Sequence, residues 1–311
     1  MVLEAAAAVV EEKLYLLGGF YTPDLKASSR CDVYDPVSDS WTRLADTPSP
    51  VTHAGVAVVD GEIWVVGGFA SDHPGAATAE VWRYNVAGNA WTPGPPLPEP
   101  RGSGALVELD GELHFFGGVK ADRDTDCADH WVLRLDENPG AWRPRAPMLN
   151  GRNHLSGAAI NGRVHAVGGQ YRHDYAPLDI DLLEAYDPAT DSWTPLAPLL
   201  RPRSHSEPGT FVHDGLLIIA GGRSNREAVL YDIDAYDPVS DRWRSLPALR
   251  IPMRAPVAKL VGDRIIAGAG GMLPNGTDPT GRLFSFPVHE LGLSESPAAG
   301  QSAPSQSAPS Q

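Results

Sequence analysis

Three histidines at repeated positions are the residues of this sequence best suited to chemistry. His53 and His154 each stand fourteen residues before a glycine pair. His205 takes the equivalent place in a fifth copy of the pattern if that copy carries two extra residues; otherwise the place belongs to Glu207. Neutral imidazoles with one carboxylate suit a first-row transition metal better than Ca²⁺ or Mg²⁺. We therefore predict a copper, zinc or iron site with the three histidines as ligands and Glu207 as the catalytic acid or base.

Charged and polar residues at the equivalent places of other copies extend this candidate site. The first copy has Glu4 fourteen residues before its glycine pair, and the third has Ser103. The sixth copy has Pro256 at this spacing, or Arg254 if the segment "AGAGG" contains a bulge. With residues of the neighbouring loops, the expected ligand-binding set is Glu4, Ser103, His130, Arg152, Tyr171, Arg203, Arg223 and Arg254.

Glycine pairs punctuate the chain at a nearly constant interval. They begin at residues 18, 67, 117, 168, 221 and 270, at spacings of 49 to 53 residues. Before each pair lie two short apolar runs, as in "HAGVAVVDGEIWVVGG", and an Asp-Gly or Asn-Gly turn between them is typical of a β-hairpin. After each pair a polar loop leads to a second hairpin, as in "EAYDPATDSW". The sequence therefore predicts six repeats of four strands, with no helix longer than about two turns.

An aromatic pair marks the second hairpin of most copies. Tyr and Trp stand seven residues apart in four of them, at Tyr34/Trp41, Tyr84/Trp91, Tyr186/Trp193 and Tyr236/Trp243. Together with the four strands and the glycine pair, this pattern resembles the kelch repeat over residues 2–291. The resemblance implies an all-β fold, a six-bladed β-propeller in which each blade is a four-stranded antiparallel sheet.

Two copies depart from the pattern, and one segment lies outside it. The third copy has Leu133 in the Tyr place and two extra residues before Trp142. The sixth copy is degenerate and lacks the Trp, so its fourth strand comes from residues 288–293, from residues before Ala5, or is absent. We expect the propeller to span residues 1–293. Residues 294–311 repeat the segment QSAPS and have almost no apolar side chains, which predicts a disordered tail or linker.

The composition excludes several partners and leaves the cellular compartment open. The chain has 25 Lys and Arg against 39 Asp and Glu, and the resulting charge of −14 repels nucleic acid and anionic membrane surfaces. No apolar run reaches the about 18 residues of a membrane span. The start "MVLEAAAAVVEEK" lacks the positive segment of a signal peptide, but a secreted protein whose signal has been removed would look the same. We expect a soluble monomer, either cytoplasmic or secreted.

The order of the strands predicts which loops meet. If the strands of each copy are labelled a to d outward from the axis, the connections from d to the next a and from b to c lie on one face. Six of the ten histidines map to this face: His53, His73, His130, His154, His173 and His205. Because functional residues usually sit on loops held by a rigid scaffold, the mouth of the central channel on this face is the predicted site.

A structural interpretation of the same residues stays open. Kelch units commonly carry an arginine and a polar residue where strand a begins. Arg101, Arg152 and Arg203 can therefore bond loop carbonyls instead of a ligand, and the histidines can be plain polar lining.

The third copy has an acidic loop with a second candidate motif. In "VKADRDTDCADHW", Asp122, Asp126 and His130 stand four residues apart. The spacing is similar to that of the Glu, Asp and His that hold iron in the plant kelch proteins that redirect glucosinolate breakdown. The alternative is a solvated acidic loop.

Two functions from different classes fit this face. The first is a small-molecule or metal site at the channel mouth, with room for catalysis; a kelch-type sugar mutarotase would use a carboxylate and an arginine such as Glu207 and Arg223. The second is a non-catalytic module that binds a protein or a glycan through the same loops. Its candidate anchors are Tyr21, Phe69, Tyr171, Arg172 and Tyr175. The clustered histidines favour the first function, with a small molecule or carbohydrate as ligand.

Overall fold

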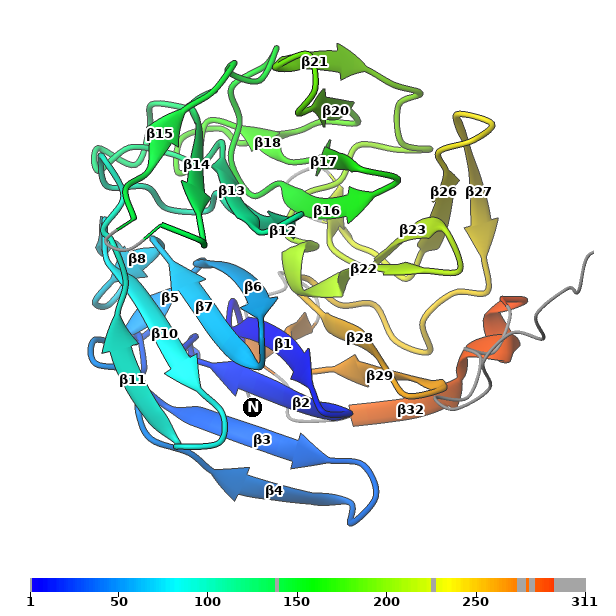
Figure 1. Cartoon of the computed structure of the whole chain (residues 1–311). Coiled ribbons are helices and arrows are strands. Elements are labelled where there is room, and N and C mark those ends of the chain that lie inside the picture. The colour runs from blue at the N-terminus through cyan, green and yellow to red at the C-terminus, as the bar shows by residue number, and fades with distance from the viewer. Residues whose placement is uncertain (1, 138–139, 225–227, 273–277, 280–282, 294–311) are drawn as a thin grey trace, which may run out of the picture.

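Six antiparallel sheets stand around a central axis and form a ring (Figure 1). The computed structural model describes residues 2–137, 140–224, 228–272, 278–279 and 283–293. Each sheet uses one stretch of chain and is called a blade, numbered 1 to 6 in chain order. The predicted all-β, six-bladed propeller is confirmed, and in the described residues the helical segments are two short 3-10 helices. The tail predicted for residues 294–311 lies outside the described residues.

Blades 1 to 3 have four strands each. Blade 1 contains β1 (Ala6–Val10), β2 (Lys13–Leu17), β3 (Cys31–Asp35) and β4 (Ser40–Arg43). Blade 2 contains β6 (Gly55–Val59), β7 (Glu62–Val66), β10 (Val81–Asn85) and β11 (Ala90–Pro93). Blade 3 contains β12 (Ala105–Leu109), β13 (Glu112–Phe116), β14 (His130–Arg134) and β15 (Arg143–Pro144).

Blades 4 and 5 repeat this arrangement, and blade 6 has three strands in the described residues. Blade 4 contains β16 (Ser156–Ile160), β17 (Arg163–Val167), β20 (Leu183–Asp187) and β21 (Ser192–Pro195). Blade 5 begins with the 3-10 helix η1 (Glu207–Gly209) and contains β22 (Thr210–His213), β23 (Leu216–Ala220), β26 (Ile233–Asp237) and β27 (Arg242–Leu246). Blade 6 contains β28 (Val257–Val261), β29 (Arg264–Gly268) and β32 (Leu283–Pro287), followed by η2 (Val288–Leu291).

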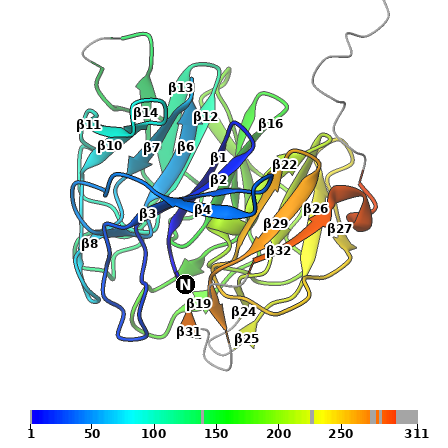
Figure 2. The ribbon, with the colours of Figure 1, turned by 90° about the horizontal axis from the view of Figure 1, so that it is seen from below.

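Short two-residue strands gather at one end of the propeller, which we call the ribbon face. They are β5 (Val51–Thr52), β8 (Phe69–Ala70), β9 (Ala76–Ala77), β18 (Gln170–Tyr171), β19 (Leu178–Asp179), β24 (Arg223–Ser224), β25 (Ala228–Val229), β30 (Gly271–Met272) and β31 (Asp278–Pro279). Figure 2 shows several of them at the same end as the N-terminus. This is the face that the strand order predicts for the connections from d to a and from b to c.

The turns between the two inner strands adopt the geometry that their sequences predict. Asn161 and Gly162 join β16 to β17 with φ of 52° and 70°. Both values are positive, as a type I′ hairpin turn requires. The turn sets the register in which Ser156 lies opposite Val167. A fixed register fixes which side chains face each neighbouring blade, because successive residues of a strand point to opposite faces.

One residue in front of each innermost strand has a left-handed backbone, and together these residues form a ring. They are Glu4, His53, Ser103, His154, His205 and Ala255, with φ between 47° and 55°. The N–H of Ser103 donates to the His53 carbonyl at 3.0 Å, and the N–H of His154 donates to the Ser103 carbonyl at 2.9 Å. The same bond joins Ala255 to His205 at 2.8 Å. We call these six residues the axial ring, because they link successive blades around the axis.

The axial ring corrects the residue assignment in two blades. In blade 5 the ring residue is His205, which the sequence offered as an alternative to Glu207. The two extra residues belong to η1, which begins at Glu207. In blade 6 the ring residue is Ala255, and the assignments to Arg254 or Pro256 are wrong.

The blade 6 assignment failed because the glycine pair of that blade is shifted by one residue. Ala269 and Gly270 adopt the positive φ values of the pair, 53° and 78°. The N–H of Gly270 donates to the Val2 carbonyl at 2.8 Å, as the N–H of Gly118 does to the Arg152 carbonyl at 2.9 Å. An alanine therefore stands where a glycine is expected, and counting from two visible glycines gives the wrong start.

We expect Gly118→Ala to lower the free energy of unfolding by about 2–5 kcal/mol. Gly118 has φ of +89°, and an added Cβ would lie 2.7 Å from the Gly102 carbonyl oxygen. Gly111→Ala is the matched control, because its φ is +80° but no atom lies within 4 Å of the added Cβ. It should cost about 1–2 kcal/mol. Urea unfolding of both variants measures the difference, and equal losses would mean that the close backbone contact has no effect.

The ring closes between blades 6 and 1 by side-chain packing. Leu14 and Leu16 of blade 1 share an apolar cluster with Val257 and Ile266 of blade 6. Of the alternatives for the fourth strand of blade 6, the described residues agree with its absence: the sheet has three strands, and after β32 the chain forms η2. Leu291 of η2 packs into the cluster between blades 5 and 6.

The predicted outer tryptophans hold neighbouring blades together. The indole N–H of Trp142 donates to the Pro95 carbonyl of the preceding blade at 2.8 Å, and that of Trp193 donates to the Ala146 carbonyl at 2.9 Å. Trp41 of blade 1 is 43% exposed. Its preceding neighbour is blade 6, which has no outer strand in the described residues.

In the described part of the chain, no helix is both long and apolar enough to cross a membrane.

Candidate functional site

A polar pocket lies at the centre of the ribbon face, where the side chains of the axial ring meet. Its volume is about 210 Å³. Its floor and walls carry charged and titratable groups, among them Glu4, His53, His154, His205, Arg223 and Arg254. We call this cavity the ring pocket. Several of its polar atoms are buried without a hydrogen-bond partner among the described residues, notably Glu4 Oε1 and Arg254 Nε, so the pocket has groups available to a ligand.

Three residues of the axial ring present metal-ligating atoms to one another. One atom from each of Glu4, His53 and His154 lies within 4.8 Å of the other two. The Glu4 Oε2 and His53 Nε2 atoms are 3.6 Å apart, and the two imidazole centroids are 5.0 Å apart. Ligand atoms that share an ion at about 2.1 Å can lie at most about 4.2 Å apart. The 4.8 Å within which the three atoms lie exceeds this limit by about 0.6 Å, so the side chains would have to move closer together to share one ion.

Each ring imidazole has its Nδ1 engaged by the side chain that precedes it. His154 Nδ1 lies 2.7 Å from Asn153 Oδ1, and the Asn153 amide donates to Asp126 Oδ1 at 2.5 Å. That second bond fixes the orientation of the Asn153 amide, so its oxygen, which can only accept, faces the imidazole. His154 Nδ1 therefore donates, and its Nε2 keeps a lone pair. His53 Nδ1 lies 2.9 Å from Thr52 Oγ1, the hydroxyl of the residue before it. Such outer hydrogen bonds orient the histidine ligands of metal sites.

His205, the third predicted metal ligand, has both ring nitrogens engaged in the described structure. Ser204 Oγ donates to Asp179 Oδ1 at 2.6 Å and lies 2.7 Å from His205 Nδ1. The other ring nitrogen, His205 Nε2, accepts from Arg254 Nη2 at 2.6 Å. Because that lone pair is used, His205 positions Arg254 in the described structure and leaves the ligating group to the other two histidines.

Burial keeps the ring histidines neutral. It lowers the pKa of His53, His154 and His205 well below the usual 6.5, and neighbouring cations such as Arg254 lower it further. Neutral imidazole is the form that binds metals. Burial also raises the pKa of Glu4, against the opposing effect of Arg254 and Arg223.

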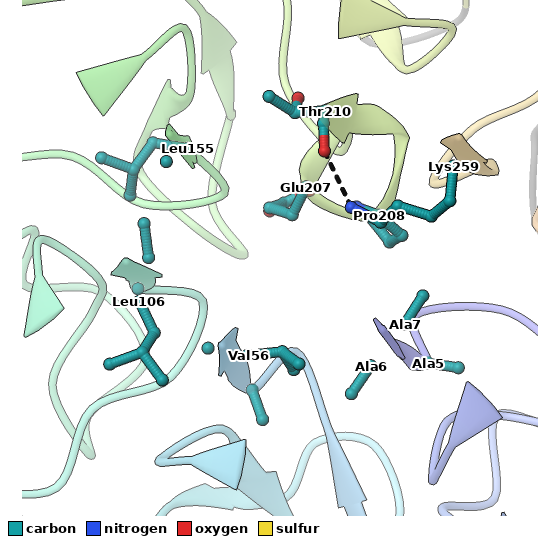
Figure 3. Close-up of a pocket in the computed structure, with 15 residues that line it drawn as sticks. Ala5, Ala6, Ala7, Val56, Leu106, Leu155, Glu207, Pro208, Thr210 and Lys259 are labelled. Carbon is teal, nitrogen blue, oxygen red and sulfur yellow. Dashed lines mark hydrogen bonds between the residues drawn. The ribbon is translucent and has the colours of Figure 1, made fainter. Parts of the chain in front are cut away.

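Glu207 lies deeper in the channel than the ring pocket. With Glu4 and Ser103 it lines a narrow cavity of about 20 Å³ that continues inward. Burial, and next the nearby Glu4 carboxylate, raise the pKa of Glu207 to about 8. Glu207 is therefore protonated at neutral pH, which makes it an acid rather than the base. Beyond it, Figure 3 shows an apolar section of the channel lined by Ala5, Ala6 and Ala7.

Two predicted ligand-binding arginines do not reach the ring pocket. Arg152 is fully buried and donates to Glu184 Oε1 at 3.0 Å and to two backbone carbonyls beneath the glycine pair. Arg203 is 1% exposed and donates to Asp234 Oδ2 at 2.6 Å. Both stand two residues before an axial-ring residue, and their guanidinium groups fasten the blades. The structural interpretation of these arginines is the correct one.

His130 and Tyr171 also lie away from the ring pocket. His130 starts β14, and its Nε2 lies 3.0 Å from His114 Nδ1 between blades 3 and 4. Tyr171 is half-buried in β18 and is not among the lining residues of the pocket. The iron-type motif does not assemble: Asp122 Oδ2 accepts from Thr125 Oγ1 at 2.6 Å, and neither it nor His130 belongs to the one metal-type group of the described residues.

Two residues of the site, His173 and Asp179, are absent from the predicted set of ligands, although the strand order maps His173 to this face. The His173 ring lies 4.8 Å from that of His154, with its Nδ1 2.7 Å from Asp174 Oδ1. Asp179 accepts from Arg223 through both carboxylate oxygens, at 2.7 and 3.2 Å. The adjacent acidic residue is a local signal for His173. Asp179 gives no such signal, because its partners are 25 and 44 residues away.

Comparison with known proteins finds the same repeat. The Kelch motif profile matches residues 1–48, 50–98, 151–200 and 205–250. The chain is 24% identical to human Kelch-like protein 23 over 70% of this chain and 29% of that protein. It is 26% identical to zebrafish (Danio rerio) Kelch-like protein 15 over 69% and 38%, and 32% identical to mouse (Mus musculus) Kelch-like protein 36 over 33% and 18%. The chain thus spans less than two fifths of the length of these relatives. The matched profile covers more than half of the sequence, and the chain belongs to the kelch repeat family.

Proposed function

We propose that the chain binds one first-row transition metal ion in the ring pocket, with Glu4, His53 and His154 as its protein ligands. The main support is the convergence of their ligating atoms within 4.8 Å. The outer hydrogen bonds of the two imidazoles and their neutral state at physiological pH add to it. Two nitrogen donors and one carboxylate favour zinc, copper or iron over Ca²⁺ and Mg²⁺.

The surroundings of the three ligands suit a small molecule that binds beside the ion. Three protein ligands leave a coordination position open, which is the arrangement of catalytic rather than structural metal sites. A bound ion would act there as a Lewis acid. Arg254, whose Nε makes no hydrogen bond among the described residues and lies 3.7 Å from Glu4 Oε1, would hold an anionic or hydroxyl group of the ligand. Glu207, protonated at neutral pH, would supply a proton.

A metal titration tests this proposal. The chain is stripped with a chelator, and Zn²⁺, Cu²⁺ and Fe²⁺ (the last without oxygen) are each titrated in by calorimetry, with elemental analysis after gel filtration. We expect one ion per chain. His154→Ala and Glu4→Gln should each weaken binding by at least about 100-fold, because each removes a direct ligand and even outer-shell losses cost about 10–100-fold.

His289→Ala is the matched control. His289 is exposed in η2, away from the ring pocket. It should bind metal like the unchanged chain, with an unchanged circular dichroism spectrum. A stripped chain that takes up no ion at micromolar concentrations, or a His154→Ala variant that binds as tightly as the original, would rule the metal site out.

A second candidate function is protein binding beside the pocket. The connection between β18 and β19 carries Arg172 and Tyr175 on the surface, and Leu178 begins β19 beside them; Tyr175 is 78% and Leu178 54% exposed. Tyr and Arg are enriched at protein interfaces. Of the other anchors considered, Phe69 is 2% exposed and therefore cannot contact a partner. Tyr175→Ser should abolish capture of a partner from extract of the source cells while leaving metal binding intact, and Glu4→Gln should do the reverse.

A further inference from the structure

A lysine lies in the half of the central channel that is remote from the ring pocket. Lys259 belongs to β28, the innermost strand of blade 6, and is half-buried. Its Nζ donates to the Thr210 carbonyl at 2.7 Å (Figure 3). It lines a cavity of about 90 Å³ with Glu207, and a wider one of about 300 Å³ toward the end of the channel opposite the ribbon face.

Most of the side chains around this amine are apolar. The wider cavity is lined by alanine, valine, phenylalanine and leucine residues of four blades, among them Ala7, Val56, Phe211 and Leu260. Glu207 is the carboxylic acid that shares the inner cavity with Lys259. No ion pair of Lys259 is found in the described part of the chain, and the amine has one hydrogen bond to a neutral carbonyl.

The other three lysines of the chain are in the opposite situation. Lys13, Lys26 and Lys120 have side chains 43%, 67% and 46% exposed. Each lies within 3.5 Å of a carboxylate oxygen. Burial lowers the pKa of Lys259 to about 8, whereas an exposed lysine has a pKa of about 10.4. At pH 7 the fraction of unprotonated amine is therefore about 200-fold higher at Lys259 than at an ordinary lysine.

We propose that Lys259 is a carbonyl-binding lysine that forms a reversible imine with small aliphatic aldehydes or ketones entering the apolar end of the channel. The unprotonated Nζ attacks the carbonyl carbon, and a proton moves from nitrogen to the carbonyl oxygen to give a carbinolamine. Loss of that oxygen as water forms the C=N bond, and addition of water reverses the step. Apolar walls accept an alkyl chain and offer a charged substituent no partner. The proposal is independent of the metal site, because it uses other residues in another part of the channel.

Reductive trapping tests the proposal on the whole chain. The protein is incubated at pH 7 with butyraldehyde and sodium cyanoborohydride, which reduces the imine to a stable secondary amine. Peptide mass spectrometry then reads the modified fraction at each of the four lysines. We expect at least about 10-fold more label at Lys259 than at any of the other three, less than the 200-fold difference in free amine because nucleophilicity falls with pKa.

Three comparisons make the result decisive. In guanidinium chloride at the same pH the preference for Lys259 should disappear, because the unfolded chain exposes all four amines equally. Glyoxylate, a charged aldehyde of similar size, should show no preference for Lys259. Lys259→Met should lose the preferential label without raising it at Lys13. Equal labelling of the four lysines in the folded chain, or an unlabelled Lys259, would overturn the proposal.

Discussion

Glu184→Ala will lower the free energy of unfolding by about 3–5 kcal/mol, because it strands a fully buried charge. Arg152 is 0% exposed and Glu184 1% exposed, with Arg152 Nη1 3.0 Å from Glu184 Oε1. The same carboxylate also accepts from the Asn150 amide at 2.8 Å. Removing it leaves the guanidinium without its counter-charge under the glycine pair of blade 4. Urea unfolding at pH 7 gives the loss.

Asp187→Ala in the same strand is the matched control. Asp187 Oδ2 lies 3.1 Å from Arg163 Nη2, but the two side chains are 27% and 43% exposed. Exposed pairs of this kind contribute about 0–1 kcal/mol. Glu184→Gln keeps the volume and part of the hydrogen bonding and should lie between the two. A Glu184→Ala variant as stable as Asp187→Ala would show that Arg152 finds another partner or water.

Lowering the pH from 6.5 to 5.5 will cost the fold at least about 3 kcal/mol. Burial lowers the pKa of His114 to about 4, of His130 to about 3 and of His165 to about 4. The unfolded chain binds protons at these residues near pH 6.5, whereas the folded chain does not. Stability is therefore present above pH 6.5 and is lost as the pH falls toward 4, by up to about 1.4 kcal/mol per histidine and pH unit.

The other buried titrating groups contribute with both signs. The ring histidines act in the same direction, since burial lowers their pKa as well. Glu207 and Glu4 act in the opposite direction, because their raised pKa values let the folded chain hold protons that the unfolded chain releases. Six histidines outweigh two carboxyl groups. Urea midpoints at the two pH values measure the net effect, and equal stabilities would contradict it.

The variant His165→Gln isolates the contribution of one of these histidines to the pH dependence of stability. His165 lies inside blade 4 at 2% exposure, and its ring is 6.2 Å from that of Tyr236. The variant should lose stability at pH 7 but show a weaker dependence on pH between 6.5 and 5.5, by up to about 1.4 kcal/mol. An unchanged pH dependence would mean that His165 is protonated in the folded chain.

The repeat made most of the fold predictable, because a local rule recurs six times. A glycine pair must adopt positive φ in every copy, and a count of fourteen residues back from it leads to Glu4, His53, Ser103 and His154 of the axial ring. The count failed where the local rule is broken. In blade 5 the two extra residues of η1 shift it, and in blade 6 Ala269 stands in a glycine place.

The site itself was only partly predictable, since knowing the face of a residue does not give the direction of its side chain. His130 is at the correct end of its strand, but its ring turns between blades toward His114 and Tyr186. The group that donates to the lone pair of His205 Nε2 is Arg254, which is 49 residues away in the sequence. Such pairings come from the closure of the ring and leave no trace in a single copy of the repeat.

The seam between blades 1 and 6 has a consequence for how such a protein can change in size. No sheet of the described structure combines strands from the two ends of the chain, since blade 1 uses β1 to β4 and blade 6 uses β28, β29 and β32. In the described structure every blade is thus encoded by one uninterrupted segment, and successive repeats are 49 to 53 codons apart, the spacing of the glycine pairs. Duplication or loss of such a segment in the gene would add or remove a whole blade without splitting any sheet. A propeller whose last blade borrows a strand from the start of the chain lacks that freedom at its seam.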